Sequence, residues 1–164
     1  MEYTCIYEAA PNKLITLPFV VLSVIELFLL IYSVVNWKKN NIGGKIGLCI
    51  VLSLLLLVIC SLIYNYCSSY AIWSAYEDGD YFVAEGIIED YVDGTEEKIS
   101  FPDRFKINDT PFIISNSPSS GYGYTIRQSD GGILENGMHC KIFYVPFKNE
   151  NIIMKILVEQ QNIK

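Results

Sequence analysis

IGLCIVLSLLLLVICSLIYNYC, residues 46–67, contains no charged residue over its 22 positions. A second apolar stretch precedes it, LITLPFVVLSVIELFLLIYSVVN at residues 14–36, and holds one charged residue, Glu26. At ~1.5 Å per residue, either stretch is long enough as a helix to cross a hydrocarbon core about 30 Å thick. A backbone in lipid must satisfy its own hydrogen bonds, so both stretches are predicted to be transmembrane helices.

The connection between the two predicted helices, residues 37–45, indicates how they are oriented. It carries Lys38, Lys39 and Lys45 and no acidic residue. Because short loops rich in lysine stay in the cytoplasm, we expect this loop there and both chain termini on the far side of the membrane. The expected outer segments are a tail at residues 1–13, a juxtamembrane linker at 68–80 and a soluble domain at 81–160.

Small and polar side chains recur at helical spacing on both predicted spans. Ser23, Glu26 and Ser33 form such a stripe on the first span, and Ser53 and Cys60 on the second. Residues of this kind collect at helix–helix contacts in lipid, where backbones approach closely and hydrogen bonds form. Two stripes that face each other in an antiparallel hairpin are therefore predicted; simple tolerance of Ser and Cys in lipid is the alternative.

Glu26 falls near the middle of the first span. A charged acid at that depth costs about 2.5–3.5 kcal/mol on insertion scales, and its default interpretation is functional, as a proton relay or an assembly contact. The alternative is a protonated, buried carboxyl that only holds helices together. We favour the alternative, because two helices with one acid make a poor transport path.

The hydrophobic period changes to that of β-strands after residue 80. Residues 81–92, YFVAEGIIEDYV, alternate between two faces, and Gly86 interrupts them as at a bulge or a barrel bend. Further short strands are predicted at residues 99–101, 104–108, 112–115, 138–145 and 152–159. A sheet of five or six short strands hides its edges by closing, so a small OB-like or SH3-like barrel is predicted, with a small sandwich second.

Charge is distributed unevenly along the chain. The part after Cys67 carries 15 acidic and 8 basic residues, although the net charge of the whole chain is −6. An acidic domain repels phosphate backbones, which argues against nucleic-acid partners. The same charge argues against docking onto an anionic lipid surface.

Sequence signals for catalysis, metals and cofactors are weak. His139 is the single histidine and adjoins Cys140, but neighbouring strand residues point to opposite faces, so the two side chains are not expected to meet. The five cysteines form no CxxC pair, and the acidic residues between 77 and 97 do not fit a calcium loop. We therefore expect no enzyme, no metal and no cofactor.

Two further features suggest contacts. The loop at residues 116–128 is rich in Ser, Gly and Tyr, and Tyr122, Tyr124 and Arg127 either form an exposed contact surface there or pack onto the barrel. Cys5 and Cys67 are both expected at the outer membrane face, where a disulfide would be permitted. Two free thiols are the favoured interpretation.

Turn glycines and core positions carry a family resemblance. They are Glu85–Gly86–Ile87–Ile88–Glu89, Gly131–Gly132, Gly137–Met138, Lys141–Ile142–Phe143–Tyr144–Val145 and Ile153–Met154–Lys155–Ile156. Over residues 83–159 the chain resembles the soluble domain of uncharacterised bacterial two-pass membrane proteins with a small C-terminal β-barrel, and less closely the domain-of-unknown-function 3592 group. The resemblance implies a bacterial source and a fold, and brings no activity or catalytic residues.

The sequence thus predicts a bacterial inner-membrane protein that presents a periplasmic β-barrel. Its expected partners are the lipid bilayer and either another protein, an envelope component or a second copy of the chain. One alternative is an accessory subunit that joins a larger membrane complex through its helical hairpin. Another is a phage- or toxin-immunity type of membrane protein, by analogy of build.

Overall fold

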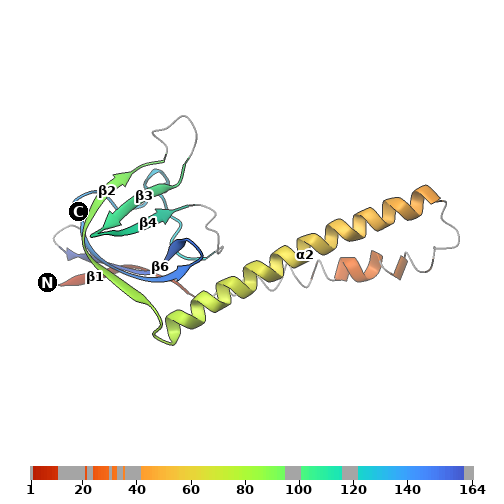
Figure 1. Cartoon of the computed structure of the whole chain (residues 1–164), viewed down its shortest axis with the longest axis horizontal. Coiled ribbons are helices and arrows are strands. Elements are labelled where there is room, and N and C mark those ends of the chain that lie inside the picture. Colours follow the sequence, from red (N-terminus) through yellow and green to blue (C-terminus); the bar gives the residue numbers. More distant parts are fainter. Residues whose placement is uncertain are drawn as a thin grey trace. The chain divides into compact units, whose positions relative to one another are not determined.

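The computed structural model divides into two units: a sheet unit, Met1–Pro11 with Ser68–Lys164, and an apolar unit, Asn12–Cys67 (Figure 1). The residues described are 2–10, 21, 24–29, 31, 32, 35, 42–94, 101–115 and 122–160.

Helix α2, Ile42–Glu77, is the main element of the apolar unit and continues into the sheet unit. At ~1.5 Å per residue its 36 residues extend over roughly 54 Å. Among the described residues, it supplies the one helix that is long and apolar enough to cross a membrane. Within the apolar unit, most of its described apolar side chains are exposed, as at Leu57, which is 66% exposed. Residues 68–77 of the linker expected at 68–80 are helical, because α2 continues through them to Glu77.

The first predicted span is described in part. Its described residues, 21, 24–29, 31, 32 and 35, are all helical. Ser23 and Ser33 lie outside the described residues. A second crossing therefore stays a prediction, although the helical conformation agrees with it.

The sheet unit contains a six-stranded antiparallel sheet in the order β1-β6-β5-β2-β3-β4. The strands are β1 (Tyr3–Glu8), β2 (Phe82–Val92), β3 (Asp103–Ile107), β4 (Thr110–Ile114), β5 (His139–Phe147) and β6 (Glu150–Glu159). A short 3-10 helix, η2, occupies Gln128–Asp130. The second half of the chain is thus all-β from Phe82 onward, apart from this one turn, within the described residues.

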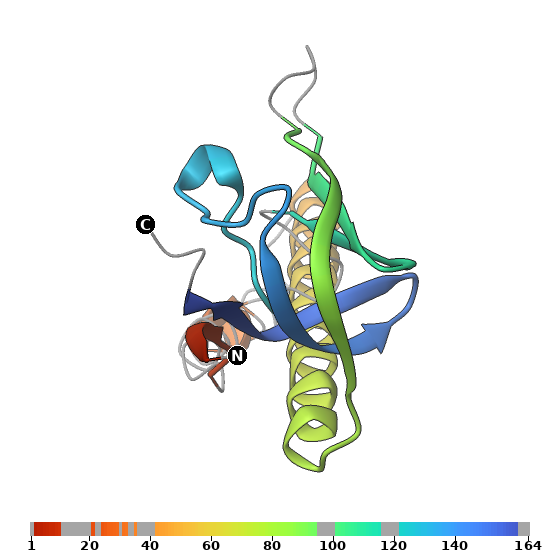
Figure 2. The ribbon, with the colours of Figure 1, turned by 90° about the vertical axis from the view of Figure 1, so that its left-hand side faces the viewer.

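The sheet is not closed into the barrel that the sequence suggested. Strand β2 exchanges partners along its length, pairing with β5 up to Ile87 and with β3 from Ile88 (Figure 2). Gly86 lies just before this exchange, and a Cβ there would come within 3.0 Å of the Asn108 side chain. Strand β4 remains an edge: its Pro111 has no N–H to donate, and accepts instead a 2.9 Å side-chain hydrogen bond from Asn151 of β6.

Strand β1 was not anticipated, because residues 1–13 were expected to form a tail. It pairs with β6 from Tyr3 opposite Glu159 to Glu8 opposite Lys155. The backbone N–H of Ala9 extends the pairing with a 2.7 Å hydrogen bond to the Met154 carbonyl. The segment before the first apolar stretch is therefore part of the same sheet as the strands that follow α2.

The two faces of the sheet carry separate cores. The inner face is the one on which Cys140, Ile142 and Ile156 lie, all fully buried with side chains from β2, β3 and β4. The opposite face, here called the outer face, is covered near Met154 by the end of α2, where Ile72 is 1% exposed. Burial of this kind stabilises by about 25 cal/mol per Å² of apolar surface, so the last turns of α2 belong to the folded domain.

A buried acid ties the inner core together. Asp103 is fully buried and accepts hydrogen bonds from the Tyr91 hydroxyl at 2.8 Å and from the backbone N–H groups of Gly94 and Gln128, both at 3.0 Å. Burial and the bond to Asp103 raise the pKa of Tyr91, which keeps its hydroxyl a donor. One carboxylate thereby joins the end of β2 to the segment at η2.

Candidate functional site

Polar side chains from four adjacent strands meet on the outer face. We call them the outer-face cluster: Tyr3 of β1, Glu159 of β6, His139 and Lys141 of β5, and Glu85 of β2. Successive residues of a strand point to opposite faces, and the neighbours Cys140 and Ile142 are buried on the inner face. The cluster therefore lies on the side of the sheet away from its main core.

Glu85 is the centre of the cluster. Its Oε1 accepts a 3.0 Å hydrogen bond from the Tyr3 hydroxyl, and its Oε2 lies 2.9 Å from the Nζ of Lys141. The Tyr3 contact joins the edge strand β1 to β2, with β6 and β5 between them. The contact therefore spans four of the six strands of the sheet.

His139 is the second hub. Its Nδ1 lies 3.2 Å from the Tyr3 hydroxyl and 3.7 Å from Oε2 of Glu159. The Tyr3 and His139 rings have centroids 6.1 Å apart. The His139 and Glu159 side chains are 25% and 16% exposed, so this half of the cluster is better covered than Glu85, at 44%.

The protonation states of the cluster follow from these contacts. Hydrogen bonds from Lys141 and from Tyr3 lower the pKa of Glu85, which holds it as an anion. Partial burial and the bond to Glu85 raise the pKa of Tyr3, which holds it as a neutral donor. The cluster thus presents paired charges and fixed donors, an arrangement suited to recognising a polar surface rather than to activating a nucleophile.

The predicted separation of His139 and Cys140 is confirmed. Cys140 is fully buried on the inner face, and His139 lies on the outer face. Burial raises the pKa of the Cys140 thiol to about 12, so it is unreactive at neutral pH. In the described part of the chain, no group of three or more His, Cys, Asp or Glu side chains is placed to hold a metal ion.

The prediction that Tyr122 and Tyr124 form an exposed contact surface is wrong. The alternative, that they pack onto the sheet domain, is confirmed. Tyr122 and Tyr124 are each 8% exposed. The Tyr122 hydroxyl donates to the carbonyl of Ala10, and the Tyr124 ring meets that of Tyr7 edge-on at 5.0 Å. Their burial follows from the backbone, because the N–H of Tyr124 bonds to the β6 carbonyl of Ile153 at 3.1 Å.

Arg127, the third residue of that loop, also does not stand free in solvent. Its Nε lies 3.3 Å from Oδ2 of Asp130, and its side chain is 13% exposed. It therefore closes the turn around η2 rather than offering a guanidinium to a partner.

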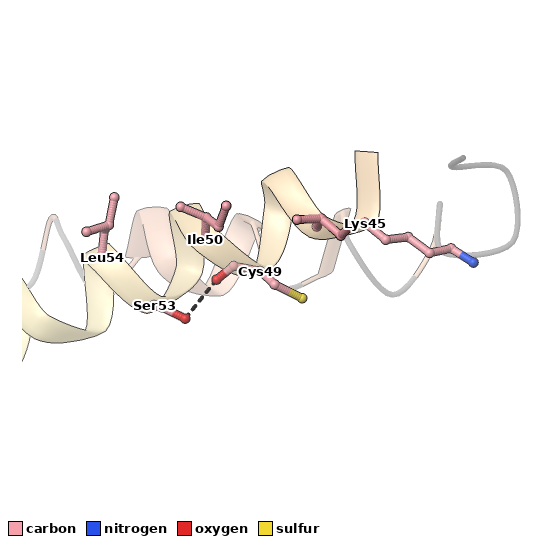
Figure 3. Close-up of a pocket in the computed structure, with 6 residues that line it drawn as sticks. Lys45, Cys49, Ile50, Ser53 and Leu54 are labelled. Carbon is pink, nitrogen blue, oxygen red and sulfur yellow. Dashed lines mark hydrogen bonds between the residues drawn. The ribbon is translucent and has the colours of Figure 1, made fainter. Parts of the chain in front are cut away.

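Cys5 and Cys67 are both free thiols, which is the interpretation that the sequence favoured over a disulfide. In the apolar unit, Glu26 is half-buried and Cys60 is exposed. The Ser53 hydroxyl donates a 2.8 Å hydrogen bond to the Cys49 carbonyl of its own helix (Figure 3). Ser53 is therefore satisfied within α2 and does not need a second helix.

An open, mostly apolar pocket of about 420 Å³ lies against the first turns of α2. Its lining residues are Lys45, Ile46, Cys49, Ile50, Ser53 and Leu54. Cys49 and Ser53 point to one side of the helix, and Ile50 and Leu54 to another (Figure 3). The two facing stripes stay a prediction, because Ser23 and Ser33 of the first span lie outside the described residues.

Sequence reasoning missed four of the five members of the outer-face cluster. Lys141 and Glu85 were visible as polar positions that alternate with core residues, which was the available signal. Tyr3 and Glu159 meet because β1 pairs with β6, and no local pattern announces that long-range pairing.

No family model, curated protein or solved structure matches this chain. The resemblance to bacterial two-pass membrane proteins and to the domain-of-unknown-function 3592 group therefore stays a prediction.

Proposed function

We propose that this chain is a two-pass protein of a bacterial inner membrane that holds a non-enzymatic binding domain on the outer side. The apolar unit is the anchor, and the sheet unit is the working part. The outer-face cluster is the surface that recognises a protein or another envelope component.

The pairing of β1 with β6 is the observation that carries the two-pass topology. β1 precedes the first apolar stretch and β6 follows α2, yet both belong to one sheet. Both ends of the apolar unit must then lie on the same side of a membrane, so the chain crosses an even number of times. If α2 crosses once, residues 14–36 supply the second crossing.

Charge supports the direction of the hairpin. The short connection at residues 37–45 contains Lys38, Lys39 and Lys45. The chain after Cys67, in contrast, carries 15 acidic residues and 8 basic ones. Lysine-rich short loops are retained in the cytoplasm, which leaves the sheet unit outside.

The surroundings of the cluster support a binding role. Val83 and Ile87, on the outer face of β2, are 44% and 50% exposed on either side of Glu85. Apolar side chains beside fixed polar pairs are typical of protein-binding surfaces. A partner would bury the two apolar side chains and exchange hydrogen bonds with Glu85 and Lys141.

Accessibility of single positions tests the topology. Cys5 is exposed on β1, so a membrane-impermeant maleimide should label it in cells whose outer membrane alone is permeable. Alkaline phosphatase fused after Lys164 should be active. An Asn40→Cys variant should label after the inner membrane is opened and not before. Labels at Cys5 and at the C-terminus on opposite sides would refute the two-pass proposal.

Site-specific photo-crosslinking tests the binding role. A photoreactive residue at Ile87 should capture a discrete partner in cells, and Lys141→Glu should abolish the capture. A matched probe at Asp109, exposed in the β3–β4 turn, should capture none. Equal capture at both positions, or capture unaffected by Lys141→Glu, would rule out the cluster as the contact surface.

Glu26 favours a second candidate, an accessory subunit assembled through the hairpin. It is half-buried, whereas the adjacent apolar residues Ile25 and Leu27 are 45% and 57% exposed. If Glu26→Leu dissolves a complex purified in mild detergent while Lys141→Glu does not, the accessory-subunit function replaces the outer-face proposal.

A further inference from the structure

A groove lies where the end of α2 meets the sheet, apart from the outer-face cluster. It has a volume of about 340 Å³. Its lining residues are Ala71, Ile72 and Ala75 of α2, Asp80 and Phe82 after it, and Val145, Pro146 and Phe147 of β5. All of them belong to the sheet unit.

The position of the groove along α2 sets its depth relative to the bilayer. Ala71 and Ala75 come four and eight residues after Cys67, the end of the span predicted at residues 46–67, which is ~6 and ~12 Å along the helix. Each headgroup layer is about 5–7 Å thick. The groove therefore begins within the headgroup layer of the outer leaflet. This step rests on the proposed membrane insertion.

An exposed aromatic side chain on the same turns agrees with that depth. Tyr70 is 63% exposed, whereas the Trp73 and Tyr76 rings, 6.0 Å apart, pack against the core of the outer face. Trp and Tyr are enriched at the membrane–water interface, where their amphipathic rings sit among headgroups.

The lining of the groove selects a ligand chemistry. Most of its lining residues are apolar, and one of them, Phe82, is 56% exposed. Asp80 is the one charged side chain in the lining, and the exposed acids Glu77 and Asp78 precede it. Pockets of this size with apolar walls and one polar group suit a ligand with an apolar body and a single complementary charge, here a cation.

We propose that this groove binds a phospholipid of the outer leaflet that carries a primary ammonium headgroup, of the phosphatidylethanolamine type. The ammonium donates hydrogen bonds to Asp80, and the upper part of one acyl chain lies against Ile72, Phe82 and Phe147. A choline headgroup has no N–H to donate, and an anionic headgroup is repelled by the acids around Asp80.

Lipid retention by the full chain tests this site. The protein is reconstituted into vesicles of equal parts phosphatidylethanolamine, phosphatidylcholine and phosphatidylglycerol, extracted in mild detergent, and its retained lipids are identified by native mass spectrometry. We expect one retained lipid per chain, with phosphatidylethanolamine preferred.

Two kinds of variant separate the groove from its charge. Ala71→Phe, at an exposed helix position, should fill the groove and reduce retention of every lipid at least about fivefold. Asp80→Asn should keep retention but lower the preference for phosphatidylethanolamine over phosphatidylcholine by about two- to fivefold, the range of an exposed charge contact. The matched controls are Ser129→Phe and Asp109→Asn, at exposed positions remote in sequence from the groove.

Three outcomes of the lipid-retention experiment would contradict the proposed groove. Equal retention by the wild-type chain and by Ala71→Phe, with both equally resistant to heat, would exclude the groove. Preference for phosphatidylglycerol, or for phosphatidylcholine, would exclude the ammonium assignment. Labelling of Cys5 and Asn40→Cys reads topology independently: if the two-pass pattern holds while no lipid is retained, the groove inference alone fails.

Discussion

The inner and outer faces of β5 are built from alternate residues of one strand, yet they have opposite character. Cys140 and Ile142 are fully buried, whereas His139 and Lys141 take part in hydrogen bonds and ion pairs on the other side. The inner face is covered by side chains of strands β2, β3 and β4, and the outer face is covered at one end by the end of α2 together with Tyr122. The difference shows that most of the buried apolar surface lies on the inner face, whereas the outer face keeps exposed polar side chains.

Thiol reactivity gives the largest contrast between the faces. Cys5 is exposed on the outer face, and Cys140 is buried with a pKa raised to about 12. An ordinary thiol has a pKa of about 8.5, so Cys140 has on the order of a thousandfold less thiolate near neutral pH, and burial slows it further. Peptide mapping after maleimide treatment should show Cys5 labelled at least a thousandfold faster. Comparable rates would show that the inner core opens readily.

Adjacent residues of β6 give the next contrast. Ile156→Ala should lower the free energy of unfolding by about 2–5 kcal/mol, because it leaves a cavity in the inner core. Leu157→Ala, on the half-buried outer face, should cost less than about 1 kcal/mol. Denaturant unfolding of the full chain in detergent, followed by a sheet-specific signal, measures both. If the two costs are equal, the faces do not differ in packing.

Two acids extend the comparison to polar groups. Asp103→Asn replaces an acceptor of three hydrogen bonds with an amide whose NH₂ faces donors, and should cost about 2–3 kcal/mol. Asp109→Asn, in the exposed β3–β4 turn, should change stability by less than about 0.5 kcal/mol. Thermal unfolding compares the variants, and a tolerated Asp103→Asn would mean that the carboxylate does not join β2 to η2.

The smallest effect is expected at Glu85 and depends on pH. Lys141 and Tyr3 lower the pKa of Glu85 in the folded protein, so its contribution is present above the unfolded pKa and is lost as pH falls through the folded value. The wild-type chain should therefore be slightly more stable than Glu85→Gln at neutral pH, and the difference should disappear in acid as the pH falls through the lowered pKa of Glu85. A gap that widens in acid would contradict the assigned pairing.

Much of the architecture could be predicted from local patterns. The uncharged run at residues 46–67 predicted a long apolar helix, and alternation in residues 81–92 and 152–159 predicted β2 and β6. The separation of His139 from Cys140 followed from strand geometry. These features depend on near neighbours in sequence, which is why patterns reveal them.

Pairing between distant segments could not be predicted in the same way. Tyr3 and Glu85 are 82 positions apart, and they meet only because β1 adds to β6. Tyr122 and Tyr124 looked like loop residues suited to contact, but their segment bonds to β6 and buries them. Exposure depends on what covers a residue, and the covering element is remote in sequence.

The sequence by itself determined the apolar runs, the lysine-bearing connection and the alternating strands, because hydrophobicity and charge act on each segment where it stands. Tertiary structure alone decided that the sheet stays open, that the N-terminal segment joins it, and that α2 runs on into its core. Those outcomes depend on which surfaces bury each other, a property of pairs of segments rather than of any one. The pairing of β1 with β6 is also the observation on which the proposed two-pass topology rests.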